Sequence, residues 1–107
     1  MKIIINSIIP FKGFTAINLF GIIFCRSEFA PLNNITLNHE AIHTKQMKEL
    51  LYLFFYLFYG LEWFIKLFFY GKDSYRNISF EREAYSHDHD QDYLSKRKPF
   101  TWIKLIL

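Results

Sequence analysis

Residues 38–46, NHEAIHTKQ, contain His39 and His43 four positions apart, with Glu40 directly after the first. On a helix, residues i and i+4 lie on one face a turn apart, so both imidazoles can aim at one point, as a tetrahedral zinc ion requires. Glu40 then lies about 100° further round the helix. From there its carboxylate can accept a proton from a water molecule held on the ion. The segment therefore predicts one zinc ion on His39 and His43, with Glu40 as general base.

This H-E-x-x-H spacing is typical of zinc peptidases. It predicts an enzyme, a zinc-dependent metallopeptidase that hydrolyses peptide bonds in a peptide or protein substrate with a zinc-activated water. The other interpretation of the same residues is two exposed histidines on an amphipathic helix.

A catalytic zinc ion needs a third protein ligand and an open position for water. Glu62 lies in an aromatic run with Lys66 as a ready partner, so the segment SFEREAYSHDHD, residues 79–90, is the better source. Its Ala84 is small enough to let two helices approach closely. Glu81 and Glu83 are about 200° apart on a helix, so only one can face the ion. The candidates considered are Glu62, Glu81, Glu83, His87 and His89.

Asp88 comes seven positions after Glu81, which places both on one helix face, so we expect Asp88 to support the site from behind the ligands. The remaining polar residues of this segment point in different directions on a helix. We expect them on a solvated face: His87, His89, Asp90 and Asp92.

The turn and capping residues along the chain predict the helices and strands that must position these residues. KIIINSIIPF and TAINLFGIIFCR predict two strands around a turn near Lys12 and Gly13. Asn33, Asn34 and Thr36 can cap a helix that begins near Ile35. Gly60 predicts a break that folds the aromatic run into a helical hairpin. A third helix is expected to start at Ser79, as its cap.

The predicted fold class is α+β, mainly α, in a single minimal zincin-like domain over residues 1–107. A β-rich edge segment with a small β-hairpin spans 1–30. The active-site helix and the aromatic-rich helical hairpin span 35–70, the third-ligand helix 79–95, and a basic, apolar tail 96–107.

Composition limits the classes of partner. The 107 residues are 51% hydrophobic and 21% aromatic, and a net charge of +3 is too small to indicate nucleic acid. Lys96, Arg97 and Lys98 predict a solvated or lipid-headgroup-facing patch. The single cysteine, Cys25, excludes an internal disulfide and is expected to be buried and inert. So many aromatic side chains would also suit a homodimer.

Residues 50–70 have about the length of a membrane span. Glu62 and Lys66 argue against a span, although they could pair on one helix face. A buried or interfacial hairpin and a transmembrane helix therefore both remain open. The apolar start of the chain is interrupted by Asn6, Pro10 and Lys12, so we expect no signal peptide. The expected location is the cytoplasm, with association with the inner membrane through 50–70 as the alternative.

HEAIH followed by FEREAY resembles a minimal gluzincin, the zinc-peptidase group with two histidines and a downstream glutamate. The pattern is similar to membrane metallopeptidases of the prenyl-protein-processing family, whose third-ligand helix reads E-x-x-A-D or E-x-x-A-N. Aligned on Ala84, this resemblance implies Glu81 as third ligand and puts Tyr85 where an Asp or Asn steadies a histidine. A thermolysin-like alignment implies Glu83 instead.

Segments like NHExIH and FEREAY also make residues 36–95 similar to short uncharacterised bacterial proteins, which imply no substrate. In the zincin plan, a strand before the H-E-x-x-H helix presents its edge to an extended peptide, and the resemblance assigns this role to LFGIIFCR. The competing function is a non-catalytic, membrane-associated or scaffold protein with a structural or vestigial metal site.

Overall fold

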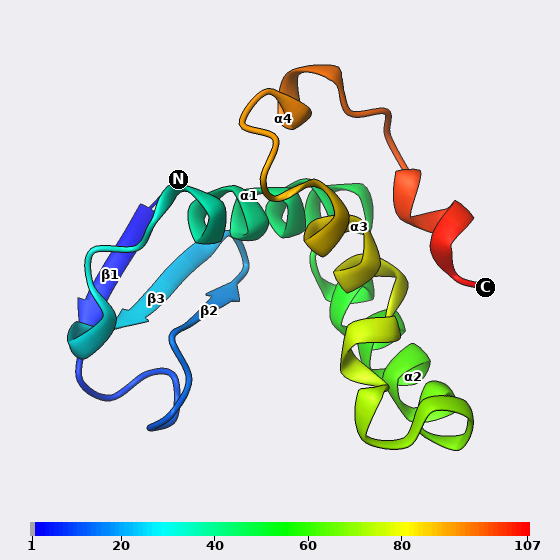
Figure 1. The fold of residues 1–107 in the computed structure, drawn as a ribbon, viewed down its shortest axis with the longest axis horizontal. Helices are drawn as coiled ribbons and strands as arrows, with labels where there is room; N and C mark the ends of the chain where they lie inside the picture. The colour runs from blue at the N-terminus through cyan, green and yellow to red at the C-terminus, as the bar shows by residue number, and fades with distance from the viewer. Residues whose placement is uncertain (1) are drawn as a thin grey trace.

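The computed structural model describes residues 2–107, which form a small sheet followed by helices (Figure 1). Strands β1 (Lys2–Asn6), β2 (Ala16–Leu19) and β3 (Ile22–Arg26) make a three-stranded sheet in the order β1-β3-β2. β1 runs parallel to the central β3, and β2 runs antiparallel to it. The predicted α+β, mainly α class is confirmed.

The predicted turn at Lys12 and Gly13 is present, with the Phe14 N–H donating to the Phe11 carbonyl at 3.1 Å, but the prediction of a single strand on each side of it is wrong. The first apolar run leaves the sheet after Asn6, because the Asn6 side chain accepts the backbone N–H groups of Ile8 and Ile9, at 2.8 and 2.6 Å, and turns the chain. The second run divides into two strands at Phe20 and Gly21, whose φ angles of 54° and 87° suit a tight hairpin turn. The sequence thus supplies three short strands.

Helix α1 (Asn34–Glu49) begins as predicted. Asn33 is its N-cap, and the Asn33 side chain accepts the backbone N–H of Thr36 at 2.8 Å. The helix ends before Leu51 and Tyr52, which have φ angles of 54° and 63°. The backbone N–H of Tyr52 donates to the Met47 carbonyl at 2.7 Å, and this bond closes the turn.

Helix α2 (Leu53–Tyr70) is one continuous helix that passes through Gly60, so the predicted hairpin around Gly60 is wrong. A glycine inside a helix costs only about 1 kcal/mol relative to alanine. Packing on either side outweighs that cost: Phe55 lies against Phe80 with ring centroids 4.7 Å apart, and Lys66 is buried beyond the glycine. The reversal of the chain falls instead at residues 50–52.

Two short 3₁₀ turns (Gly71–Asp73 and Tyr75–Asn77) lead to helix α3 (Ser79–His87). Ser79 is not the cap that the sequence predicts, because Ile78 holds that position. A carboxylate from α2 serves the helix start instead. Glu62 accepts the Ser79 backbone N–H at 2.6 Å and the Ser79 hydroxyl at 2.7 Å.

The third helix is shorter than the predicted 79–95. The Asn38 side-chain amide donates to the carbonyls of His87, Asp88 and Asp90, at 3.3, 3.0 and 2.9 Å. These bonds hold the chain in a turn, and a separate short helix, α4 (Tyr93–Lys96), follows. The tail ends in a 3₁₀ segment (Thr101–Leu105).

The core lies where α1, α2 and α3 meet. One cluster contains Met47, Phe55, Ile78, Phe80 and Trp102. A second contains Ile42, Ala84 and Tyr93, all of them buried. Since Ala84 is fully buried beside Ile42, α1 and α3 approach closely, as the small side chain predicts. This contact sets the spacing between the histidines of α1 and the glutamates of α3.

Candidate metal centre

Helix α1 places His39 and His43 on one buried face. Their side chains are 10% and 7% exposed, and the two Nε2 atoms are 3.2 Å apart. The local reason is the four-residue spacing, which puts the second ring one turn above the first. The predicted convergence of the two imidazoles is present.

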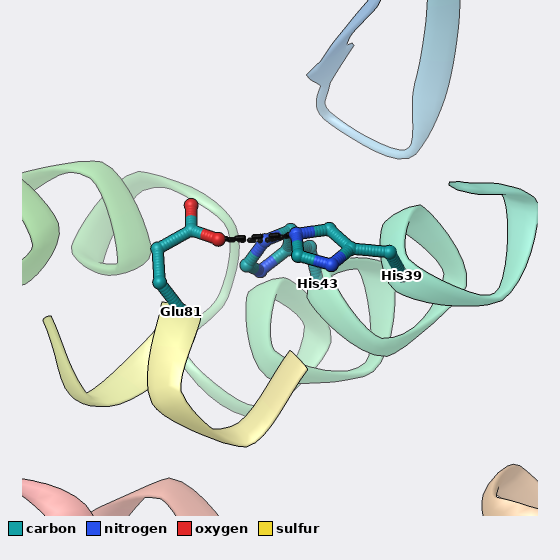
Figure 2. A group of neighbouring side chains, drawn as sticks. All are labelled: His39, His43 and Glu81. Atoms are coloured by element: carbon teal, nitrogen blue, oxygen red, sulfur yellow. Dashed lines mark hydrogen bonds and ion pairs between the residues drawn. The ribbon is translucent and has the colours of Figure 1, made fainter. Parts of the chain in front are cut away.

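Helix α3 brings Glu81 to the same point (Figure 2). Its Oε1 lies 3.1 Å from His39 Nε2 and 3.0 Å from His43 Nε2. A tetrahedral ion with bonds of about 2.0 Å holds its ligand atoms roughly 3.3 Å apart, close to this spacing. Two imidazole nitrogens and one carboxylate oxygen are also a donor set that zinc accepts. The group His39, His43 and Glu81 can therefore hold a metal ion.

Each of the three ligands is fixed by a bond on its far side. His39 Nδ1 lies 3.0 Å from Asp88 Oδ2, and His43 Nδ1 lies 2.8 Å from Gln46 Oε1. Both Nδ1 atoms therefore face acceptors and carry the protons, which leaves the Nε2 lone pairs for an ion. The Tyr59 hydroxyl donates to Glu81 Oε2 at 2.6 Å. Such bonds orient metal ligands and raise their basicity.

The predicted support from Asp88 is present. Tyr85 contacts the site through its ring. The ring packs edge-on against His39, with centroids 4.5 Å apart. Its hydroxyl lies 3.4 Å from that of Tyr75. Sequence reasoning missed Gln46, although a glutamine three positions after His43 on the same helix is a readable signal. It also missed Tyr59, which reaches Glu81 only because the chain reverses at 50–52.

Of the two candidate glutamates, Glu83 points away from the histidines. It accepts hydrogen bonds from Gln46, Tyr93 and Arg97, at 3.0, 2.6 and 2.5 Å. Glu62 pairs with Lys66 at 2.7 Å. His87 stacks on Tyr93 with ring centroids 3.9 Å apart, and His89 is exposed beside Asp88.

The pKa values of Glu81 and His43 depend on each other, because the two side chains lie 3.0 Å apart. Burial raises the pKa of the Glu81 carboxyl, but His43 and the hydrogen bonds from both histidines outweigh burial and lower it. Burial lowers the pKa of His43, but the Glu81 carboxylate outweighs that and raises it to about 9. Each of the two groups therefore favours the charged form of the other. A bound cation would take the place of the histidine's proton, as deprotonation of ligands on metal binding requires.

Glu40 lines a cavity of about 410 Å³ that reaches His43 and Glu81. Burial raises the pKa of the Glu40 carboxyl, and its neighbours His43 and His39 pull it back. Tyr75 lines the same cavity. The rest of the wall is mainly apolar and comes from the loop after β1, from β2 and from α2: Pro10, Phe11, Phe14, Ile17, Phe55 and Tyr56.

The strand beside this cavity is not the predicted one. Residues Ile22–Arg26 form the central strand, paired on both edges, whereas Ala16, Ile17 and Asn18 of β2 line the cavity. Asn18 fixes β2 to the metal-site helix, because its side-chain amide donates to the Glu40 carbonyl at 2.9 Å. The edge strand next to the site is therefore β2.

Comparison of the chain with protein-family models, curated proteins and solved structures finds no match. The likeness to gluzincins therefore rests on the residues of the HEAIH and FEREAY segments.

Proposed function

We propose that this protein is a zinc-dependent peptidase. The observation that carries the proposal is the convergence of His39 Nε2, His43 Nε2 and Glu81 Oε1 at 3.0–3.2 Å, beside a cavity that Glu40 lines. Three protein ligands leave one tetrahedral position open, which distinguishes catalytic zinc sites from structural ones with four. The cavity gives a substrate access to that side.

Zinc at this point would supply Lewis-acid chemistry, lowering the pKa of water and stabilising negative charge on a carbonyl oxygen. The chain supplies the proton transfers. The Glu40 carboxylate accepts a proton from the attacking water and passes it to the leaving amine. Tyr75 offers a hydroxyl at the cavity wall, where it can donate to the substrate carbonyl. Asp88, Gln46 and Tyr59 keep the ligands aligned.

The cavity wall defines the substrate class. Five aromatic or aliphatic side chains from three elements surround the space next to the site: Phe11, Phe14, Ile17, Phe55 and Tyr56. A peptide with a bulky apolar side chain beside the scissile bond fits this lining. Strand β2 would pair with the backbone of such a peptide in an extended conformation.

A non-catalytic protein with a structural metal site is the second candidate. The exposed apolar surface of α2 favours it, since that surface would serve attachment equally well without catalysis. The two candidates differ in what they require of Glu40. A structural site has no use for a carboxylate that neither binds the ion nor fixes a ligand.

The test compares Glu40→Gln with Glu81→Gln and with Glu28→Gln, which changes an exposed glutamate outside the cavity. Zinc content is measured by elemental analysis, and hydrolysis with a library of quenched fluorescent peptides that carry bulky apolar side chains. We expect Glu40→Gln to keep its zinc and to lose about 10²- to 10⁴-fold in rate, as loss of a general base does. Glu81→Gln should lose both zinc and hydrolysis, and Glu28→Gln neither.

Two results would contradict the proposal. One is a zinc-loaded wild-type protein that cleaves no peptide in the library. The other is cleavage that Glu40→Gln leaves unchanged, which would place the activity elsewhere or in a contaminant.

A further inference from the structure

The outward side of α2 is an apolar surface with no cover. We call it the outer face of α2, and its members, all exposed, are Leu53, Phe54, Leu57, Phe58, Leu61, Phe64, Ile65, Phe68 and Phe69. Phe68 and Phe69 are each 77% exposed. Within residues 2–107, Leu53–Asp73 is the one segment both long and apolar enough to cross a bilayer, and little of it is buried. Such a surface on one helix marks a contact with an apolar phase or partner.

The charged and hydroxyl-bearing side chains of α2 are bonded to other parts of the chain. Glu62 accepts from Ser79 of α3, and Lys66 donates to Glu62 and to the Asn77 carbonyl. The helix also carries three tyrosines, and their hydroxyls bond to Asn18, Glu81 and Arg82 in the order Tyr56, Tyr59, Tyr70. The outer face is therefore left without a charged or hydroxyl group.

The tail extends the same apolar surface. A groove of about 620 Å³ lies between α2 and the C-terminal residues. Its lining is mainly apolar (Phe58, Leu61, Ile65, Phe69, Trp102, Ile106 and Leu107), and Glu62, Lys66 and Tyr70, which are bonded to other parts of the chain, also contribute to it. Ile103 is 50% exposed beside it. Figure 1 shows α2 and the C-terminal segment on the same side of the molecule, opposite the sheet.

Exposed lysines flank this region in the sequence. Lys72 directly follows α2, and Lys98 and Lys104 lie in the tail whose Trp102 and Ile106 line the groove. Asp73 is the acidic side chain next to Lys72, so these segments keep a positive balance. Positive charge next to an apolar surface is complementary to anionic phospholipid, whose headgroups lie above the acyl chains.

The side chains of the outer face and the bonds on the opposite side of α2 indicate a lipid surface and the orientation of the helix on it. Protein interfaces carry about one hydrogen bond per 100–200 Å², and the outer face offers no charged or hydroxyl group for one. The opposite side of α2 is fixed to the body through Tyr59, Glu62 and Lys66, so lipid cannot surround the helix as it surrounds a span. One side of the helix faces protein and the other is free.

We propose that α2 lies in the plane of a bilayer surface, with its outer face among the acyl chains and the flanking lysines at anionic headgroups. The helix then acts as a monotopic anchor. It holds the cavity beside the metal site near the membrane, because Tyr59 of α2 also bonds to Glu81. The anchor goes beyond the proposed peptidase activity and needs no metal ion.

The test is sedimentation with vesicles of phosphatidylglycerol and phosphatidylcholine, and with vesicles of phosphatidylcholine alone. We expect binding to the anionic vesicles, weaker binding to the neutral ones, and a decrease with added salt. Phe68→Ser with Phe69→Ser should weaken binding at least about tenfold, because two large apolar side chains leave the acyl phase. Ile5→Ser with Phe29→Ser, at the sheet end, is the matched control and should bind as wild type does.

Circular dichroism and zinc content show whether the α2 variant is still folded, so that its loss of binding can be assigned to the surface. His39→Ala should lose zinc and keep vesicle binding, which separates this proposal from the peptidase proposal. A wild-type chain that binds neither type of vesicle would overturn it. So would a stable dimer in solution that the α2 variant converts to monomer without any change in vesicle binding.

Discussion

Two carboxylates of α3, only two positions apart, are both buried and yet stand in opposite electrostatic settings. Glu83 meets a fixed cation: Arg97 binds it at 2.5 Å and also binds Glu49 at 2.8 Å. In the described residues, the ion-pair partners of Glu81 are His39 and His43, and its remaining oxygen takes the Tyr59 hydroxyl. Both side chains are buried, but only Glu83 has a partner with a permanent positive charge.

The difference shows what separates a structural ion pair from a ligand set. A buried charge needs a compensating charge, and Glu83 has one in the chain itself. Glu81 is compensated only by a proton on a histidine or by a bound cation. Gln46 connects the two clusters, since its amide N–H donates to Glu83 and its carbonyl oxygen faces His43. The same helix pair therefore carries one closed network and one site that can take an ion.

The largest expected effect lies in the closed network. Arg97→Ala leaves the buried Glu83 and the partly buried Glu49 without their cation, and we expect the free energy of unfolding to fall by about 3–5 kcal/mol. Urea denaturation measures it. The adjacent exposed Lys98→Ala is the control and should change stability by less than about 0.5 kcal/mol. Equal effects of the two substitutions would show that the Glu83 cluster is no ion network.

Zinc should stabilise the folded chain by binding to His39, His43 and Glu81, and the Glu83 network should not contribute to this gain. At free zinc of 100 to 1,000 times the Kd, the folded chain gains about 2.7–4 kcal/mol, read as a rise in Tm that a chelator reverses. We expect Glu81→Gln to lose this gain. Glu83→Gln starts from a lower Tm and should keep the gain. If both variants gained equally from zinc, Glu81 would not be a ligand.

The smallest expected effects come from the two tyrosines that donate to these carboxylates. Tyr59 donates to Glu81 and Tyr93 to Glu83, each at 2.6 Å. Either Tyr→Phe substitution should lower stability by about 1.5–3 kcal/mol, because a charged acceptor loses its donor. Only Tyr59→Phe should also weaken zinc binding, by about 10- to 100-fold in a titration. A similar loss of affinity in Tyr93→Phe would mean that the two networks are coupled through Gln46.

The tail provides a related lesson. The sequence predicts one solvated or lipid-headgroup-facing patch of Lys96, Arg97 and Lys98, and for Arg97 this prediction is wrong. Its side chain is 5% exposed and lies between Glu49 and Glu83. Nothing in three consecutive basic residues marks the middle one, because its partners come from helices 14 and 48 positions away along the chain.

The sequence by itself determined the local half of the site. The sequence predicts a capped helix start near Ile35, and the four-residue spacing of His39 and His43 converges two imidazoles, since both depend only on helix geometry within one or two turns. Ala84 likewise marked the close approach of two helices.

The tertiary structure decided which glutamate completes the site. Glu81 and Glu83 are both glutamates of the same short helix, and the angle at which α3 packs on α1 turns one to the histidines and the other to Arg97. It also decided that α2 continues through Gly60, that Tyr59 returns to Glu81, and that β1 pairs in parallel with β3. These outcomes depend on contacts between residues far apart in the chain, which no local pattern encodes.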